Sequence, residues 1–184
     1  FAADEVGGVL EAVLPAVRPS SSPAAVPTLA VAPLPHGPGS CVLVRRTGSN
    51  EEERNSAVVL TVQAAPEELA NYTMCELVAQ VLSQQCFDEL RTKQQLGYIV
   101  ALQSYADSSM DTGFCGIKVI VQSEKHPAEV HRRIDAWLKD ALASLAEMTD
   151  EQLGEYHQAL LTLKREKPKK LSDEFALNWS EVRS

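Results

Sequence analysis

Two segments of the chain alternate between apolar and polar residues, which is the period expected of half-buried β-strands. In residues 113–122 the alternating apolar positions are Cys115, Ile117, Val119 and Val121. Residues 98–105 precede this segment across a loop rich in Ser and Asp. The pattern therefore predicts a pair of strands around that loop.

Two β-branched runs upstream predict a second pair of strands. They are residues 41–47 (CVLVRRT) and residues 56–64 (SAVVLTVQA). Residues 48–55 between them are polar and acidic, as expected of a turn. We expect the two runs to form a hairpin.

Elsewhere the apolar residues recur at intervals of three and four, which predicts helices. A long helix is expected from Pro66 to about Leu90, since Pro and the two following glutamates suit a helix start. Pro127 opens the next helix, and Thr149 to Gln152 (TDEQ) fits a capping box at the start of another, which Pro168 ends. The expected core-facing positions of these three helices are Ala70, Met74, Leu77, Val78 and Val81, then Val130, Ile134, Trp137, Leu138, Ala141 and Leu145, then Leu153, Tyr156, Leu160 and Leu163. Ser172, Asp173 and Glu174 are expected to cap a last helix carrying Phe175, Trp179 and Val182.

The order of elements is strand pair, long helix, strand pair and three helices, which predicts an α+β fold with an antiparallel or mixed sheet packed by helices on one face. Residues 18–39 contain six prolines among Ser, Ala and Val and predict an extended linker. Residues 1–17 are then the tail of a preceding domain, and the domain proper is 40–184. We expect it to be truncated at its C-terminus, because the sequence stops in mid-helix without a terminating Gly or Pro.

Composition narrows the function classes. A formal net charge of −8 argues against a general nucleic-acid binder, and no apolar run is long enough to cross a membrane. The four cysteines show no C-x-x-C pair or ligand spacing, which favours free thiols in a reducing, cytoplasmic setting over a zinc cluster or disulfides. A basic run, Lys164 to Lys170, leaves nucleic-acid binding as a weak alternative, although cations at a helix C-terminus already explain it.

One stretch nearly matches a metal motif. His126, Glu129 and His131 (HPAEVH) resemble the inverted zinc signature H-x-x-E-H. Its two histidines must be four apart to share a helical face, whereas these are five apart, roughly 140° around the helix. We therefore expect no metal site here, and Pro127 places His126 at the entrance of a helix.

The strongest candidates for chemistry are Arg91 and Tyr98, in CFDELRTKQQLGYIV at the predicted helix-to-strand corner. A guanidinium and a phenol placed together can donate hydrogen bonds to a peptide carbonyl or a developing oxyanion. Gly97 between them would let the backbone approach a ligand closely. The residues alone leave another interpretation open, in which Arg91 caps its helix and Tyr98 is an ordinary strand aromatic.

This stretch, together with IVQSEKHP at residues 120–127 and KREKPKKLSDEFALNWSEV at residues 164–182, resembles the C-terminal half of the pitrilysin (inverzincin) family of zinc metallopeptidases. The insulin-degrading-enzyme-like branch is more similar than the nardilysin branch. The likeness covers roughly residues 40–184, and the R-T-K-x-x-L-G-Y core is its most specific part.

The resemblance implies a clamshell of four related α+β domains, of which the first carries zinc through H-x-x-E-H and a downstream Glu. This chain would be the last, non-zinc domain, which helps to enclose peptide substrates. The Arg and Tyr of the R-T-K-x-x-L-G-Y motif, here Arg91 and Tyr98, would reach across to the zinc site in the N-terminal half and assist hydrolysis of small peptides. The resemblance also allows a homo-oligomer, and it implies neither a nucleic acid nor a membrane as a partner.

No H-x-x-E-H occurs in the chain, so it holds no zinc or other cofactor of its own and is expected to be inactive in isolation. The alternative is a catalytically inactive homologue that serves as a peptide-binding or assembly subunit.

Overall fold

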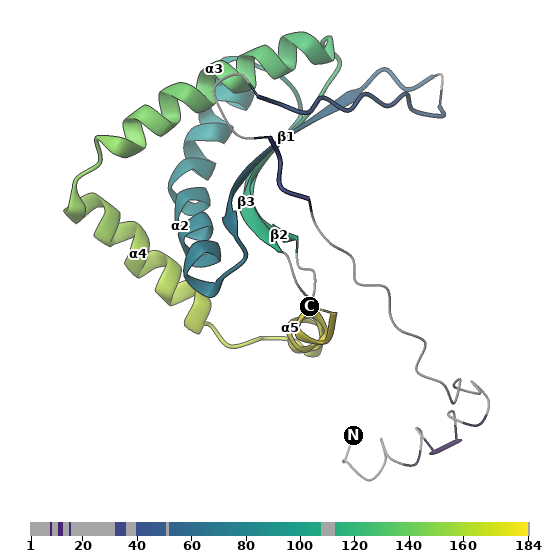
Figure 1. Ribbon diagram of the computed structural model, residues 1–184, viewed down its shortest axis with the longest axis vertical. Helices are drawn as coiled ribbons and strands as arrows, with labels where there is room; N and C mark the ends of the chain where they lie inside the picture. The colour runs from purple at the N-terminus through teal and green to yellow at the C-terminus, as the bar shows by residue number, and fades with distance from the viewer. Residues whose placement is uncertain are drawn as a thin grey trace.

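The computed structural model of the chain describes residues 8, 11, 12, 15, 32–35, 40–50, 52–107 and 113–183, with the backbone alone for 180–183. Most of the expected tail (1–17) and linker (18–39) lies outside these residues. Within them the fold is α+β, as predicted, with one open antiparallel sheet and helices packed on it (Figure 1).

The sheet has three strands in the order β1-β3-β2. They are β1 (Ser56–Pro66), β2 (Ile99–Asp107) and β3 (Phe114–Ser123), and β3 pairs antiparallel with both neighbours. Its alternating residues 115, 117, 119 and 121 are buried, as the sequence pattern predicted. One face of the sheet is therefore apolar and needs a cover.

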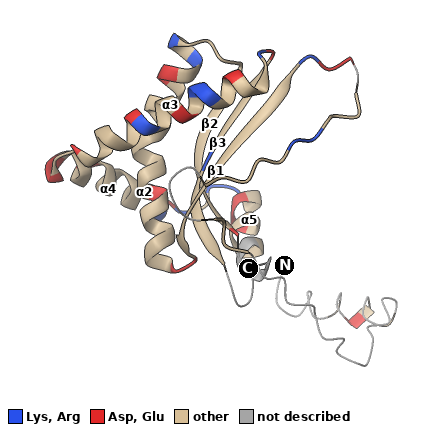
Figure 2. Cartoon of the chain, turned by 45° about the horizontal axis from the view of Figure 1, so that its top comes forward, with Lys and Arg blue, Asp and Glu red and all other residues tan. Residues whose placement is uncertain are grey.

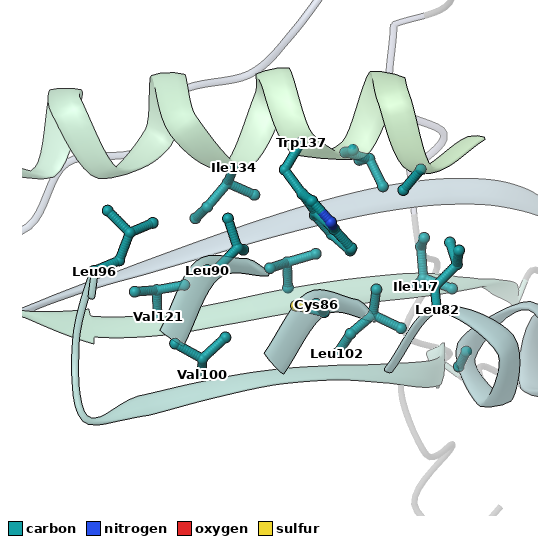
Figure 3. Close-up of a cluster of buried hydrophobic side chains, with 14 of the residues drawn as sticks. Leu82, Cys86, Leu90, Leu96, Val100, Leu102, Ile117, Val121, Ile134 and Trp137 are labelled. Atoms are coloured by element: carbon teal, nitrogen blue, oxygen red, sulfur yellow. The ribbon is translucent and has the colours of Figure 1, made fainter. Parts of the chain in front are cut away.

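Helices α2 (Leu69–Cys86) and α3 (Pro127–Ala146) supply that cover, as Figures 1 and 3 show. Helix α2 continues without a break into the short π-helix η1 (Phe87–Lys93). Helices α4 (Asp150–Arg165) and α5 (Leu171–Arg183) follow α3. Helix α4 contacts α2, and its apolar face is buried only at Leu160.

The core lies between the sheet and the helices α2, η1 and α3 (Figure 3). Its fully buried side chains include Leu82 and Leu90 from the first helix, Val119 and Val121 from β3, and Ile134 from α3. Burying one such side chain stabilises the fold by about 1.5–3 kcal/mol. The core thus joins the end of α2 and η1 firmly to the sheet.

Two helix-start signals in the second half of the chain are confirmed, whereas the expected cap at Ser172 to Glu174 is wrong, because α5 already begins at Leu171. Pro127 is at the first position of α3, and His126 Nδ1 accepts a hydrogen bond from the Ala128 amide. Helix α4 starts at Thr149 with the predicted capping box, in which the Thr149 and Gln152 side chains bind each other's amides. The capping residues in the sequence therefore predicted the starts of α3 and α4 correctly.

The prediction of a strand at residues 41–47 is wrong. This segment has no strand structure, and β1 pairs with β3 instead of forming the expected hairpin. Val42, Leu43 and Val44 are 59%, 62% and 68% exposed. A β-branched run has no strong intrinsic preference for a strand without a surface on which to pack.

The predicted start of the long helix is also wrong. Pro66 is the last residue of β1, where its missing N–H costs no ladder bond, and α2 begins after Glu68. The first predicted core positions, Ala70 and Met74, are consequently exposed, and burial begins at Cys75.

Several apolar residues of the predicted C-terminal helices are exposed, among them Leu163, which was expected to face the core. Leu163 in α4 and Phe175 and Trp179 in α5 are 54%, 62% and 50% exposed. The Phe175 and Trp179 rings stack on each other at a centroid distance of 5.9 Å. The apolar stripe predicted each helix correctly but not whether another element of the chain covers it.

Charge is concentrated on the helices and loops rather than on the sheet (Figure 2). The strands carry two charged residues, Asp107 and Lys118. None of the helices in the described residues has the length and apolar character needed to span a membrane.

The buried thiols give a direct test of this core. Burial raises the pKa of Cys75 to about 11 and that of Cys86 to about 12, so both stay protonated at pH 8. Because the thiolate is the nucleophile, we expect N-ethylmaleimide to label exposed Cys41 at pH 8 and to leave Cys75, Cys86 and Cys115 unlabelled. Mass spectrometry of peptides measures this, and all four should react in denaturant. Labelling of Cys86 as fast as Cys41 in the folded chain would contradict the packing.

Candidate functional site

A helix-to-strand corner positions the two predicted site residues. In η1 the backbone turn is wider than in an α-helix, since the Gln94 amide donates to the Glu89 carbonyl, five residues back, at 2.9 Å. Gln95 then adopts a left-handed conformation with φ 49°, uncommon for a residue with a side chain. The Leu96 amide donates back to the Leu90 carbonyl at 2.9 Å. Wide turns and left-handed residues of this kind are frequent at functional sites.

This corner brings Arg91 and Tyr98 together, as the sequence interpretation required. The Arg91 guanidinium carbon lies 4.8 Å from the centroid of the Tyr98 ring and 4.7 Å from that of the Phe87 ring. Arg91 is half-buried, whereas Tyr98 is 81% exposed. The guanidinium thus contacts two aromatic rings at the surface.

The polar atoms of the pair remain unused. Within the described part of the chain, neither the Arg91 guanidinium nor the Tyr98 hydroxyl makes a hydrogen bond or ion pair. An arginine carries five N–H donors and a tyrosine one O–H. The arrangement can therefore offer several donors to an oxygen of a bound molecule.

The two acids that precede Arg91 on the same helix have other partners, and Asp88 accepts a hydrogen bond from the Gln84 side chain at 3.0 Å. Glu89 pairs with Lys93 at 2.9 Å and accepts a hydrogen bond from Gln94 at 3.1 Å. These donors lower the pKa of Glu89, and the Glu89 carboxylate raises the pKa of Lys93. The Glu89 charge is thereby directed to Lys93, and Arg91 keeps its donors.

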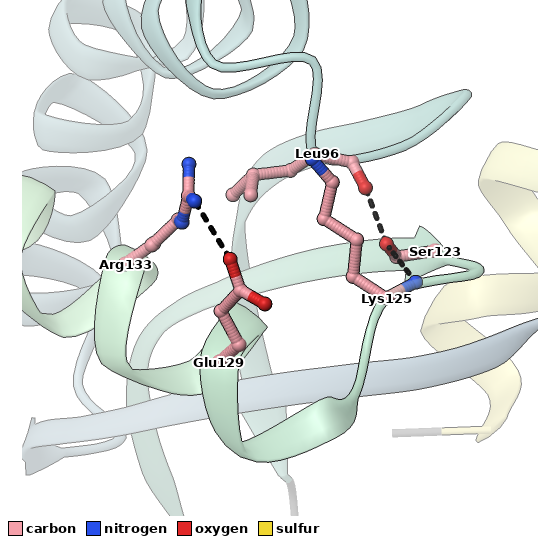
Figure 4. A network of polar contacts seen from close by, with 5 residues as sticks. All are labelled: Leu96, Ser123, Lys125, Glu129 and Arg133. Atoms are coloured by element: carbon pink, nitrogen blue, oxygen red, sulfur yellow. Dashed lines mark hydrogen bonds and ion pairs between the residues drawn. The ribbon is translucent and has the colours of Figure 1, made fainter.

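The loop before Tyr98 is fixed to the end of β3 (Figure 4). The Ser123 hydroxyl, which is 2% exposed, donates to the Leu96 carbonyl and accepts from the Lys125 amide at 3.0 Å. A Cβ added at Gly97 would lie 1.8 Å from the backbone oxygen of Gln122. The expectation that Gly97 leaves room for a ligand is therefore wrong, because the β3 backbone fills that room.

Next to this loop, Glu129 and Arg133 on α3 form an ion pair at 2.6 Å (Figure 4). Together with the Ser123 hydrogen bonds, it places satisfied polar groups around the corner. The polar network near the site is thus structural, and it engages neither the Arg91 guanidinium nor the Tyr98 hydroxyl within the described residues.

Two cavities among the described residues do not include the site pair. One, of about 550 Å³, is lined by residues of α2, η1 and α3, including Glu89, Lys93 and Trp137. The other, of about 360 Å³, is apolar and lies between α2 and α4. Arg91 and Tyr98 line neither, so they form an open patch that one further surface would have to enclose.

The other sequence candidates have structural partners. His126 caps α3, His131 is exposed, and the described residues hold no group of three or more His, Cys, Asp or Glu side chains that could bind a metal ion. In the basic run, Lys164 pairs with Glu76 of α2 at 2.6 Å, and Lys169 pairs with Glu166. These pairs favour the interpretation of the run as a helix end.

Sequence reasoning missed Phe87 as a member of the site. Phe87 lies four residues before Arg91 in the sequence, and this spacing was a usable signal. Side chains four residues apart on a helix face each other, and arginine pairs readily with aromatic rings.

The arrangement of elements is similar to that of a solved protein, pitrilysin. The crystal structure of pitrilysin matches with a TM-score of 0.56 at 25% identity, over 68% of this chain and 13% of that chain. The fold is therefore a pitrilysin-type domain that carries its candidate residues at a helix-to-strand corner.

Sequence comparison gives the family. The profile of "PQQ synthase PqqF-like, C-terminal lobe domain 4" matches residues 77–179, and the chain belongs to this family of pitrilysin-type C-terminal domains. Human insulin-degrading enzyme is 36% identical over 133 residues, which are 72% of this chain and 13% of that protein. Insulin-degrading enzyme-like 1, peroxisomal, from Arabidopsis thaliana is 34% identical over 149 residues, which are 80% and 15%. The chain thus spans about an eighth of the length of these relatives.

The close contact at Gly97 can be tested with a matched substitution. We expect Gly97→Ala to destabilise the chain by about 1–3 kcal/mol, because the new Cβ must displace the β3 backbone rather than a flexible side chain. Gly154→Ala, inside α4 with nothing within 4 Å, should instead stabilise it by about 0.5–1 kcal/mol. Urea unfolding followed by circular dichroism measures both. Equal stability of the two variants would contradict the described corner.

Proposed function

We propose that this chain is the C-terminal, substrate-binding domain of an insulin-degrading-enzyme-like zinc metalloendopeptidase that hydrolyses small peptides. The observation that carries the proposal is the half-buried Arg91 guanidinium, which lies beside the Tyr98 phenol and makes no hydrogen bond or ion pair with the described residues. The relatives that are named insulin-degrading enzyme support the class of reaction.

In this proposal Arg91 and Tyr98 bind the carbonyl of the peptide bond that is cleaved. As the tetrahedral intermediate forms, negative charge develops on the carbonyl oxygen, and donors already in place stabilise it without reorganising. The guanidinium can donate from two N–H groups to one oxygen or to neighbouring oxygens, and the exposed phenol can reach a ligand that lies over the patch.

In this proposal the metal is held by the N-terminal half of the complete protein, where the family resemblance implies an H-x-x-E-H motif. Zinc bound there would lower the pKa of its water and supply the nucleophile. The residues of this chain then contribute binding, orientation and charge stabilisation. The N-terminal half and the peptide substrates are its proposed partners, and a cytoplasmic location stays a prediction.

The alternative proposal is a catalytically inactive homologue that binds peptides or assembles with a partner. The open, unenclosed patch of Arg91 and Tyr98 serves binding as well as catalysis. An H-x-x-E-H motif in the complete polypeptide distinguishes the two, because the zinc-dependent reaction needs it.

The role of the donor pair predicts a kinetic effect. In the complete protein, Tyr98→Phe should lower kcat by on the order of 100-fold, since one donor to the developing oxyanion is lost. Tyr98 is 81% exposed, so the same change should leave the thermal midpoint of unfolding almost unchanged. Cleavage of a fluorogenic peptide and a melting curve measure the two quantities. An unchanged kcat would favour the strand-aromatic interpretation of Tyr98.

The proposed assignment of zinc to the N-terminal half predicts that the isolated chain has no peptidase activity. The isolated 184-residue chain should cleave no peptide, with or without added zinc, because it has no zinc-activated water. The complete protein should cleave peptides and lose this activity in 1,10-phenanthroline. Chelator-sensitive cleavage by the pure isolated chain would overturn the assignment of zinc to the other half.

A further inference from the structure

We propose that Phe87 is a positioning residue of this site, whose ring holds the Arg91 guanidinium against the Tyr98 ring and keeps its N–H donors free. The inference deepens the proposed function and rests on it. It starts from the contact at 4.7 Å between the Arg91 guanidinium carbon and the centroid of the Phe87 ring.

Phe87 has no evident role in the core. It is 38% exposed and does not belong to the buried cluster that joins the helices to the sheet, unlike its neighbours Cys86 and Leu90. A large aromatic side chain left at the surface, in contact with a half-buried cation, is better explained by that contact than by packing.

Ring faces hold a cation differently from a carboxylate. A carboxylate would accept hydrogen bonds from the guanidinium and occupy its donors, whereas a ring attracts the charge through its face and leaves the N–H groups at the rim. With rings at 4.7 and 4.8 Å, Arg91 is fixed from two sides without an ion pair. The arrangement suits a group that must be held in place yet remain available to a ligand.

The two rings reach Arg91 by different routes. Phe87 approaches from within the same helix, one turn earlier, and Tyr98 approaches after the chain has turned at Gln95. The position of Tyr98 depends on the loop, whereas that of Phe87 depends on the helix alone. Phe87 therefore fixes Arg91 even when a ligand displaces the exposed Tyr98 ring.

The contacts of Arg91 with the Phe87 and Tyr98 rings, here called the clamp, can be tested without measuring enzyme activity. In NMR spectra of the 184-residue chain, the Arg91 side-chain protons should be shifted upfield by the ring currents of Phe87 and Tyr98. Phe87→Leu should move these signals toward their positions in an unfolded peptide, and Phe87→Tyr should keep them. Lys118→Met, which removes a similar contact at 4.2 Å between Lys118 and Tyr105, is the control and should leave them unchanged. Signals that do not move in Phe87→Leu would overturn the clamp.

The consequence for the reaction is measured in the complete protein. Phe87→Leu should lower kcat by roughly threefold to thirtyfold, the range that corresponds to losing one cation–π contact, with little change in KM. Phe87→Tyr should restore the rate, and Lys118→Met should not affect it. In an Arg91→Ala background, Phe87→Leu should have no further effect, because Phe87 acts through Arg91.

The other outcomes separate the two proposals. An equal loss from Phe87→Leu with and without Arg91 would show that Phe87 acts on the substrate or the fold, which overturns the positioning role alone. An unchanged kcat in Phe87→Leu would do the same and leave the proposed function intact. Absence of peptidase activity in the unaltered complete protein would overturn the proposed function, and the catalytic purpose of Phe87 with it, whatever the NMR spectra show.

Discussion

The contact between the 94–98 loop and the end of β3 is the constraint on which the candidate site depends. Leu90 and Leu96, on either side of the turn, are fully buried and anchor it in the core. Gly97 lies directly against the β3 backbone, and the buried Ser123 hydroxyl ties down the Leu96 carbonyl. An unpaired hydroxyl at such a depth costs about 1–3 kcal/mol, so the bond is also a condition for burying Ser123. The packing of the core therefore determines how the site residues are oriented.

The sequence predicted the parts of the fold that local chemistry decides. The alternation in β3 and the capping signals at Pro127 and Thr149 describe interactions within a few residues, and they are confirmed. The prediction of a strand at residues 41–47 failed because β-branched residues form a strand only where they have a surface to pack on. The sequence of the segment does not show whether such a surface exists. The prediction that Pro66 starts a helix failed because proline is tolerated both at the end of an edge strand and at the start of a helix.

The candidate site was predictable to a different degree. Residue type and position at a period change singled out Arg91 and Tyr98, and the family resemblance gave them a role. Their contact depends on the wide turn of the π-helix η1, which has more residues per turn than an α-helix, and on the left-handed conformation of Gln95. The spacing of apolar residues does not reveal the wider turn, because an α-helix through the same residues is also expected to bury Leu90. Phe87 was missed for a different reason: its spacing from Arg91 could be read from the sequence, but its importance lies in its contact with the guanidinium.

The electrostatics of the corner explain why a guanidinium can stay available in a chain with a formal net charge of −8. An acidic protein offers many carboxylates, and an arginine that pairs with one loses the donors that a ligand would use. Here Glu89 is taken by Lys93, and Glu129 by Arg133. Aromatic faces hold Arg91 instead, and such contacts leave its hydrogen-bonding capacity intact. In the proposed role this surface binds and orients a carbonyl, and a partner surface brings the nucleophile to the open side of the patch.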